Sequence, residues 1–293
     1  MKIEKISINI KNINSETSLY KKFDGVQTLF YQPIDCRIRN GVRIKDGSTS
    51  VHSLCCDSMR NWDLFINYHY FEDVMKNLGI IAIEEKVERN SYIAKRDFLV
   101  YSQFVLTCIQ RIISVFKNEA IDVELNHKIT NTIAHIKKLI NAYLDELGYN
   151  AINDDKETFL VSKEASTIAV AELYPQISEV VQEYKRIDLK GNTTRKKELL
   201  MGFANEFEPI RERLEKNKNS EKLASDLGFL FNNCHIRHNN KEGAKKKEYI
   251  SKLDLKGLEK IYDKTYDYFL LAMLHLNYTN NAQFMGDLKQ KIN

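Results

Sequence analysis

Apolar residues recur at helical spacing through most of the chain beyond residue 50. This period covers about 96–118 and 127–147, and Gly148 ends the second stretch. Residues 59–78 carry aromatic and aliphatic side chains at the same spacing, whereas 149–160 form a polar connection. Apolar positions three or four residues apart share one helix face, so the pattern predicts a mainly α-helical protein.

The first fifty residues follow a shorter, two-residue period. Apolar or β-branched side chains mostly alternate with other residues at Ile3, Ile6, Ile8, Ile10, Val26, Thr28 and Phe30. Alternation at this period is typical of strands. We therefore expect a small β-containing segment at residues 1–50.

The end of this segment predicts a β-hairpin. A two-residue Asn-Gly loop would place Ile38 and Val42 on opposite faces of the ribbon. A three-residue loop over 39–41 pairs Ile38 with Val42 and Cys36 with Ile44. We prefer the second register because it gathers the apolar side chains on one face.

The C-terminal part has the clearest helical patterns. They cover about 163–173 and 176–187, and Pro175 between them should break the helical path because it lacks a backbone N–H. Further helices are predicted from Thr194 and from about Glu221.

The last helix carries a seven-residue repeat with three-four spacing. Its members are Leu255, Leu258, Tyr262, Thr265, Phe269, Ala272 and Leu276. Such a stripe packs inside a helical bundle or against a second subunit, and the sequence leaves both open. A homodimer formed through the C-terminal helices is therefore one expectation.

Composition supports a helical fold with a real core. The chain of 293 residues is 43% hydrophobic and 29% charged, far from a disordered composition. Only three prolines and eleven glycines are present, which favours long helices over a turn-rich β fold. The net charge of +4 is mild, so a nucleic-acid partner would depend on local clustering of basic side chains.

Cysteine usage and apolar segments bear on where in the cell the protein is located. None of the five cysteines forms Cys-x-x-Cys, so neither a disulfide framework nor a zinc site is indicated. The first residues lack the apolar core of a signal peptide. The most apolar segment, 98–116, is interrupted by polar residues and predicts a buried helix, not a membrane span. We expect a cytoplasmic protein with free thiols, no membrane association, no metal and no cofactor.

Side chains suited to chemistry cluster in one stretch. Two histidines, one arginine and four asparagines fall within residues 231–240. The candidate catalytic residues are His238, Arg237, Asn232, Asn233 and His235. Imidazole can move a proton near neutral pH, guanidinium can bind a phosphate, and amides can orient both. The candidate RNA-binding residues are Lys241, Lys245, Lys246 and Lys247.

A structural interpretation of this stretch is also open. If the helix beginning near Glu221 continues through His238, that histidine extends the apolar stripe of Leu227, Phe231 and Cys234. His238 would then be a buried, hydrogen-bonded residue at a helix end. The asparagines suit helix termini and turns, and a run of lysines often forms a solvated loop.

Two motifs carry a resemblance to a known family. They are Leu227-Gly228-Phe229-Leu230-Phe231-Asn232-Asn233 followed by Ile236-Arg237-His238-Asn239, and Ile261-Tyr262-Asp263-Lys264-Thr265-Tyr266. With a long final helix, they resemble the C-terminal domains of bacterial abortive-infection-type proteins, which are similar to the HEPN superfamily of small helical domains. The resemblance covers roughly residues 160–280.

The resemblance implies a metal-independent ribonuclease site. In the family, an arginine precedes a histidine by four to six residues, and a homodimer usually completes the site. The ribose 2′-hydroxyl attacks the adjacent phosphate and leaves a 2′,3′-cyclic phosphate. His238 matches the histidine, but Asn232 stands where the arginine is expected, and Asn233 matches the polar residue that follows. Asparagine orients a phosphate without neutralising it, so Arg237 would have to supply the charge.

A second nuclease pattern lies near residue 80. The apolar run over 80–83 is too short for its period to separate a buried strand from a helix end. Taken as a strand and followed by Glu84 and Lys86, it matches the strand and Glu-x-Lys of restriction-like nucleases. That site needs an upstream acid, for which Asp73 and Asp63 are the candidates.

The sequence thus predicts three regions: a β-containing segment at 1–50, a helical sensing or partner-binding region at 51–155, and a HEPN-like helical domain at 156–293. The leading hypothesis is a bacterial antiviral-defence or toxin-type endoribonuclease that needs no metal. The alternative is a non-catalytic helical RNA-binding or regulatory module, with a metal-dependent restriction-like nuclease as a minor one. RNA, a second copy of the chain, and an antitoxin or phage-derived trigger are the expected partners.

Overall fold

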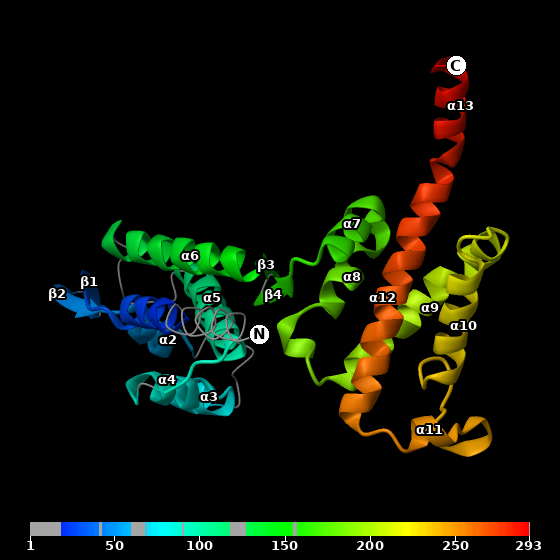
Figure 1. Cartoon of the computed structure of the whole chain (residues 1–293). Coiled ribbons are helices and arrows are strands. Elements are labelled where there is room, and N and C mark those ends of the chain that lie inside the picture. The colour runs from blue at the N-terminus through cyan, green and yellow to red at the C-terminus, as the bar shows by residue number, and fades with distance from the viewer. Residues whose placement is uncertain are drawn as a thin grey trace, which may run out of the picture. The chain divides into compact units, whose positions relative to one another are not determined.

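The chain folds into two compact units that comprise residues 1–160 and 161–293 (Figure 1). The computed structural model describes residues 19–40, 43–59, 68, 70–89, 91–117, 127–154 and 157–292. Helices dominate these residues and strands form two small sheets, so the prediction of a mainly α-helical protein is confirmed. The three predicted regions stay a prediction.

The N-terminal unit packs short helices and a hairpin around two long helices. Its described elements are a helix over 19–31, β1 (Ile34–Asn40), β2 (Arg43–Thr49), α2 (Val51–Ser58), α3 (Phe71–Asn77), α4 (Ile80–Glu88), α5 (Lys95–Lys117), α6 (His127–Leu147) and β3 (Tyr149–Asn153), which pairs with β4 (Thr158–Ser162). Both long helices lie where apolar periodicity predicted them.

The long helix α5 forms the centre of this unit. It packs against α2, α4 and α6, and Phe98, Val105, Ile109 and Ile112 on it are buried. By length and composition alone, Lys95–Val115 could cross a membrane, but 67% of its apolar window is buried inside the structure. It is therefore a core helix, as its interrupting polar residues predicted.

The strand predicted near residue 28 is wrong, because 19–31 is helical. Phe23, Val26 and Phe30 are fully buried, and their spacing of three and four residues is that of a helix face. Val26 and Phe30 satisfy the two-residue and the helical period alike, so three positions could not separate them. The isoleucines at 3–10 lie outside the described residues.

The hairpin exists, but in a register that differs from both predicted ones. Ile38 lies opposite Lys45, and Cys36 lies opposite Gly47. At the base of the hairpin, Ile34 is paired with Thr49 and both side chains are buried. Burial at the base accounts for this register better than apolar pairing beside the turn does.

In this unit one open alternative is resolved and one further prediction is wrong. Residues 80–83 open the helix α4 after Gly79, whose left-handed φ of 73° ends the preceding turn. Ile80, Ile83 and Val87 are buried at helical spacing, so this run is not the strand of a restriction-like nuclease. The connection expected at 149–160 contains β3 and the start of β4.

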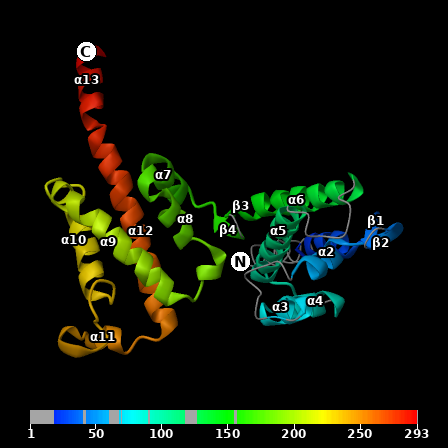
Figure 2. The same cartoon turned by 180° about the vertical axis from the view of Figure 1, so that it is seen from behind.

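The C-terminal unit is a helical bundle (Figure 2). Its elements are α7 (Ala165–Leu173), η3 (Pro175–Ile177), α8 (Ser178–Tyr184), η4 (Ile187–Leu189), α9 (Thr193–Glu215), α10 (Glu221–Asn233), η5 (Gly243–Lys245), α11 (Glu248–Ser251), α12 (Leu255–Asn280) and α13 (Ala282–Ile292). The break at Pro175 is confirmed, since α7 ends before it.

The helix α12 organises the core of this bundle. It packs against α7, α9 and α10, and the predicted stripe from Leu258 to Leu276 is buried among them. Leu255, the first member of the stripe, is 62% exposed. The stripe therefore packs within the chain's own bundle, which resolves the two alternatives that the sequence left open.

Candidate functional site

The candidate residues lie in and next to a loop over 234–247, which joins α10 to α11 and which we call the basic loop. The helix α10 ends at Asn233, and Cys234 closes it by donating its backbone N–H to the Leu230 carbonyl at 3.1 Å. The next residue, His235, has a φ of 61° and is the one non-glycine residue with positive φ among those described. The helix does not continue through His238, and the stripe suggested for that case does not form.

A buried asparagine fixes His235 in this unusual conformation. Asn240 is 1% exposed, and its Oδ1 accepts the backbone N–H of His235 at 2.8 Å. Asn240 also donates its Nδ2 to the Lys245 carbonyl at 3.0 Å, while the Tyr262 hydroxyl donates to the His235 carbonyl at 3.2 Å. A left-handed conformation costs about 1–2 kcal/mol for such a residue, and these bonds offset that cost.

The imidazole of His235 is oriented by the same asparagine. The backbone N–H of Asn240 donates to Nδ1 at 3.2 Å, so Nδ1 carries no proton and a neutral ring carries its proton on Nε2. Nε2 in turn lies 3.4 Å from Nζ of Lys197 on α9. The ring N–H on Nε2 and the Lys197 ammonium group thus point toward the same place, and both are hydrogen-bond donors.

Burial and neighbouring lysines disfavour the charged forms of His235 and Lys197. Burial, then the positive charges of Lys197 and Lys241, lower the pKa of His235 below its ordinary value of 6.5, against a smaller opposing effect of the His238 backbone and Glu242. Burial also lowers the pKa of Lys197. Two donors that face each other in this way would both gain from an anionic oxygen between them.

His238 lies against a lysine of the same loop. Lys245 Nζ is 3.2 Å from Nε2 and 3.3 Å from Nδ1 of its half-buried ring. Lys246 and Lys247, like Lys245, are exposed, and Lys241 is half-buried. The predicted RNA-binding lysines therefore border one short, basic segment that contains both histidines.

Arg237 is engaged by the bundle. Its Nη1 donates to the Glu208 carboxylate at 2.9 Å, its Nη2 donates to the Ala204 carbonyl, and the guanidinium lies 5.8 Å from the centre of the Phe231 ring. A phosphate could bind Arg237 through two nitrogens only by displacing Glu208 and the Ala204 carbonyl. The geometry favours Arg237 as a residue that ties the basic loop to α9.

The asparagines of the stretch mostly stabilise local backbone. Asn233 donates its Nδ2 to the Phe229 carbonyl at 3.0 Å within α10, and half-buried Asn232 precedes it on the last turn. Asn239 accepts the backbone N–H groups of Lys241 and Glu242 at 3.2 and 3.3 Å, which forms a turn. Because α10 ends at Asn233, neither Arg237 and Asn233 nor His235 and Asn239 share a helix.

Sequence reasoning missed two residues of this site. Lys197 lies 38 positions before His235, and no periodic pattern connects the two. Asn240 is in the asparagine-rich stretch, but nothing in the sequence singles it out as the residue that holds His235. A contact across the bundle and a left-handed φ both depend on tertiary structure.

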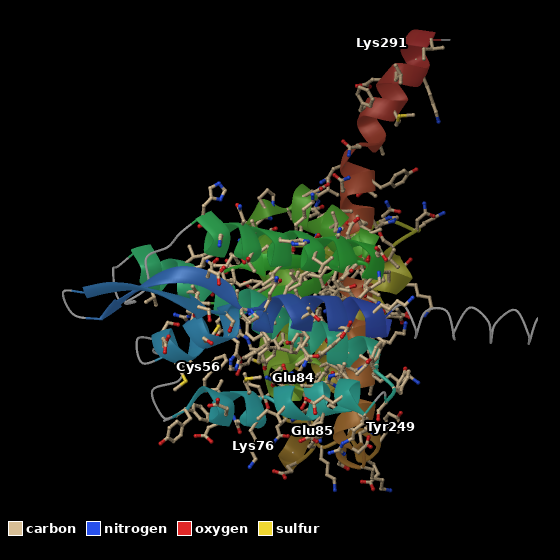
Figure 3. The ribbon with its side chains drawn as sticks, turned by 90° about the vertical axis from the view of Figure 1, so that its left-hand side faces the viewer. Cys56, Lys76, Glu84, Glu85, Tyr249 and Lys291 are labelled. Carbon is tan, nitrogen blue, oxygen red and sulfur yellow. The ribbon has the colours of Figure 1, made fainter. Side chains whose placement is uncertain are left out.

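The second nuclease pattern is not assembled. Glu84 lies on α4 (Figure 3), accepts a hydrogen bond from the Tyr31 hydroxyl at 3.0 Å, and has its pKa raised mainly by burial. Lys86 is ion-paired with Asp97 at 2.7 Å. Asp73 lies on α3, and Asp63 is outside the described residues. Within the described part of the chain, no three His, Cys, Asp or Glu side chains are grouped as metal ligands would be.

No protein-family model, curated protein or solved structure matches this chain. Any function assigned to this chain therefore depends on the geometry of the basic loop, and the family resemblance only suggests which ligand to consider first.

Proposed function

We propose that this chain binds RNA, and that the basic loop together with Lys197 contacts the phosphate backbone. The carrying observation is the His235–Lys197 pair, in which two donors 3.4 Å apart face each other and a buried asparagine fixes one of them. A phosphate oxygen would accept from both groups and remove their mutual repulsion. The family resemblance makes RNA the polyanion of choice.

Charge around this pair supports the proposal. The exposed lysines 245–247 attract a phosphate backbone regardless of sequence. Binding would release counterions from the RNA, so the affinity would depend on salt concentration. Tyr249, on α11 just after them, is 70% exposed (Figure 3). An exposed aromatic ring beside basic side chains suits stacking of an unpaired base, so single-stranded RNA is the preferred form.

A second candidate function is metal-independent RNA cleavage, favoured by the contact of His238 with Lys245. In this reaction the imidazole takes the proton of a ribose 2′-hydroxyl, and the 2′-oxygen forms a bond to phosphorus. The bond to the 5′-oxygen breaks, and that oxygen leaves with a proton taken from water. Lys245 would neutralise the phosphate, a role that Arg237 could take only after releasing Glu208. A defence or toxin context, a cytoplasmic location, and an antitoxin or phage-derived trigger belong to this proposal.

Binding and cleavage are separated by one experiment on purified protein. Labelled single-stranded RNA is titrated with wild type, His235→Asn and His238→Ala, and the same mixtures are analysed for product ends with and without EDTA. Asparagine is chosen at 235 because it tolerates a left-handed φ. The binding proposal predicts that wild type binds and that His235→Asn binds about fivefold or more weakly, the effect of one lost hydrogen bond to a charged group.

Cleavage has its own outcome in that experiment. EDTA-resistant products with 2′,3′-cyclic phosphate ends, lost in His238→Ala, establish the ribonuclease. Binding without products leaves the RNA-binding module. A folded wild type that binds no RNA at physiological salt contradicts both.

A further inference from the structure

The C-terminal helices carry a second seven-residue stripe, which faces away from the bundle and which we call the outer stripe. One row consists of Leu271, Tyr278, Met285 and Ile292, each seven residues after the last. A second row starts at Leu274, which still packs against the bundle core, and continues beyond the bundle with Asn281 and Leu288. The first row is 52%, 67%, 46% and 75% exposed, in that order. This stripe is distinct from the buried one at 258–276, because it occupies the opposite side of α12.

The outer stripe runs without interruption from α12 into α13. Asn281 at the junction has right-handed helical backbone angles. It donates its N–H to the Asn277 carbonyl at 3.2 Å and accepts from Met285 N–H at 3.3 Å, so the four-residue hydrogen-bond ladder crosses the junction. The helix α13 extends α12 away from the other helices of the unit, with Lys291 near its far end (Figures 1 and 3).

The exposed area of the outer stripe is close to what one partner contributes to a standard interface. Together with Phe284, which is 65% exposed beside the stripe, the outer stripe presents on the order of 700 Å² of side-chain surface per copy, against about 800 Å² per partner in a standard interface. A seam with apolar residues alternately three and four positions apart is the pattern that packs knobs into holes of an equal helix. The occupant that offers an identical seam is the chain itself.

We propose that two copies of this chain pair through their outer stripes as a parallel, in-register two-stranded coiled coil over 271–292. Asn281, the one polar residue in the two rows, determines the direction. In a parallel pair it lies opposite Asn281 of the second copy, and the two amides hydrogen-bond. Nδ2 of Asn281 already donates to the Asn277 carbonyl at 3.0 Å in its own helix, so the direction depends on Oδ1. In an antiparallel pair Oδ1 would face an apolar residue of the other row and would be buried without a donor.

Light scattering after size exclusion tests the pairing on the full chain. Wild type at tens of micromolar should have twice the monomer mass of 34.2 kDa. Leu288→Asp places a charge in the seam and should weaken association about 100-fold, to a monomer under the same conditions. Gln290→Asp adds the same charge at an exposed position of α13 outside the stripe and should remain a dimer. Circular dichroism and thermal melting verify that both variants retain the bundle.

The direction is tested by Asn281→Cys. Under mild oxidation, a parallel in-register pair should yield a disulfide-linked dimer in high yield, which wild type with its native cysteines should not. A monomeric wild type, or a Leu288→Asp variant that stays dimeric, overturns the pairing. A dimer in which Asn281→Cys does not cross-link overturns the parallel direction. Monomers that instead bind anionic lipid vesicles assign the outer stripe to a membrane surface, and also overturn it.

Discussion

Two groups of side chains in the basic loop differ in what they contact. Asn240 bonds to the loop's own backbone at His235 and Lys245, and Arg237 bonds to Glu208 and the Ala204 carbonyl of α9, so both fix the loop. The rings of His235 and His238 face lysine ammonium groups instead. Residue type alone ranked Arg237 as the phosphate ligand. Its contacts favour a positioning role, and the proposal therefore assigns the phosphate to the histidine–lysine pairs.

The largest expected effect is a loss of stability when a residue that fixes the loop is removed. Asn240→Ala removes the acceptor for His235 N–H and the donor to the Lys245 carbonyl, both in a buried setting. We expect a loss of about 2–3 kcal/mol in the free energy of unfolding, because buried backbone groups lose their partners. Chemical denaturation measures this loss. A loss below about 0.5 kcal/mol would contradict the role of Asn240 in fixing the loop.

Arg237→Ala is the next effect in size. It removes the Glu208 ion pair, the bond to the Ala204 carbonyl and the packing on Phe231, and should lower the free energy of unfolding by about 1–2 kcal/mol. Under conditions where the variant is folded, its RNA affinity should stay within about twofold of wild type. A selective loss of RNA affinity with unchanged stability would return Arg237 to the phosphate site.

A smaller effect is expected on RNA affinity when a residue of the histidine–lysine pairs is removed. Lys197→Ala should leave thermal stability unchanged, because its described side-chain contact is with another basic group. RNA affinity should fall about five- to tenfold, the value of one charge-assisted contact. Lys218→Ala, an exposed lysine between α9 and α10, is the matched control and should bind as wild type does.

The smallest effect is a pH dependence. The pKa of His235 is lowered below 6.5 in the folded chain, so the unfolded chain binds more protons in that range and stability falls as pH drops through about 6.5. RNA affinity should rise over the same interval, because protonated His235 attracts phosphate. His235→Asn should remove this part of both profiles, whereas an unchanged stability profile in that variant would contradict the lowered pKa.

Sequence periodicity located the long helices because each offers many turns of evidence. The predicted 127–147 and 96–118 match α6 and α5 to within one residue at either end. The short runs at 26–30 and 80–83 fit more than one period, so the first was misassigned and the second was left open between a strand and a helix end. The hairpin at 149–162 was missed, because its strands are only five residues long.

The candidate site was found by residue type and misjudged in detail. Clustering of histidine, arginine and lysine identified the basic loop. The partner of His235 comes from another helix, and its backbone conformation depends on Asn240 and Tyr262. Such long-range contacts leave no local pattern. The seven-residue repeat at 255–276 was offered for dimerisation from the sequence. Burial shows that this repeat packs inside the bundle and that the exposed repeat lies on another side of the helix.

The central claim is that His235 and Lys197 together bind a phosphate. The most direct test is the salt dependence of single-stranded RNA affinity for wild type, Lys197→Ala and Lys218→Ala. The account predicts weaker binding by Lys197→Ala alone, and a log–log salt slope smaller by about one than that of wild type. Equal affinities and slopes for all three proteins would contradict it.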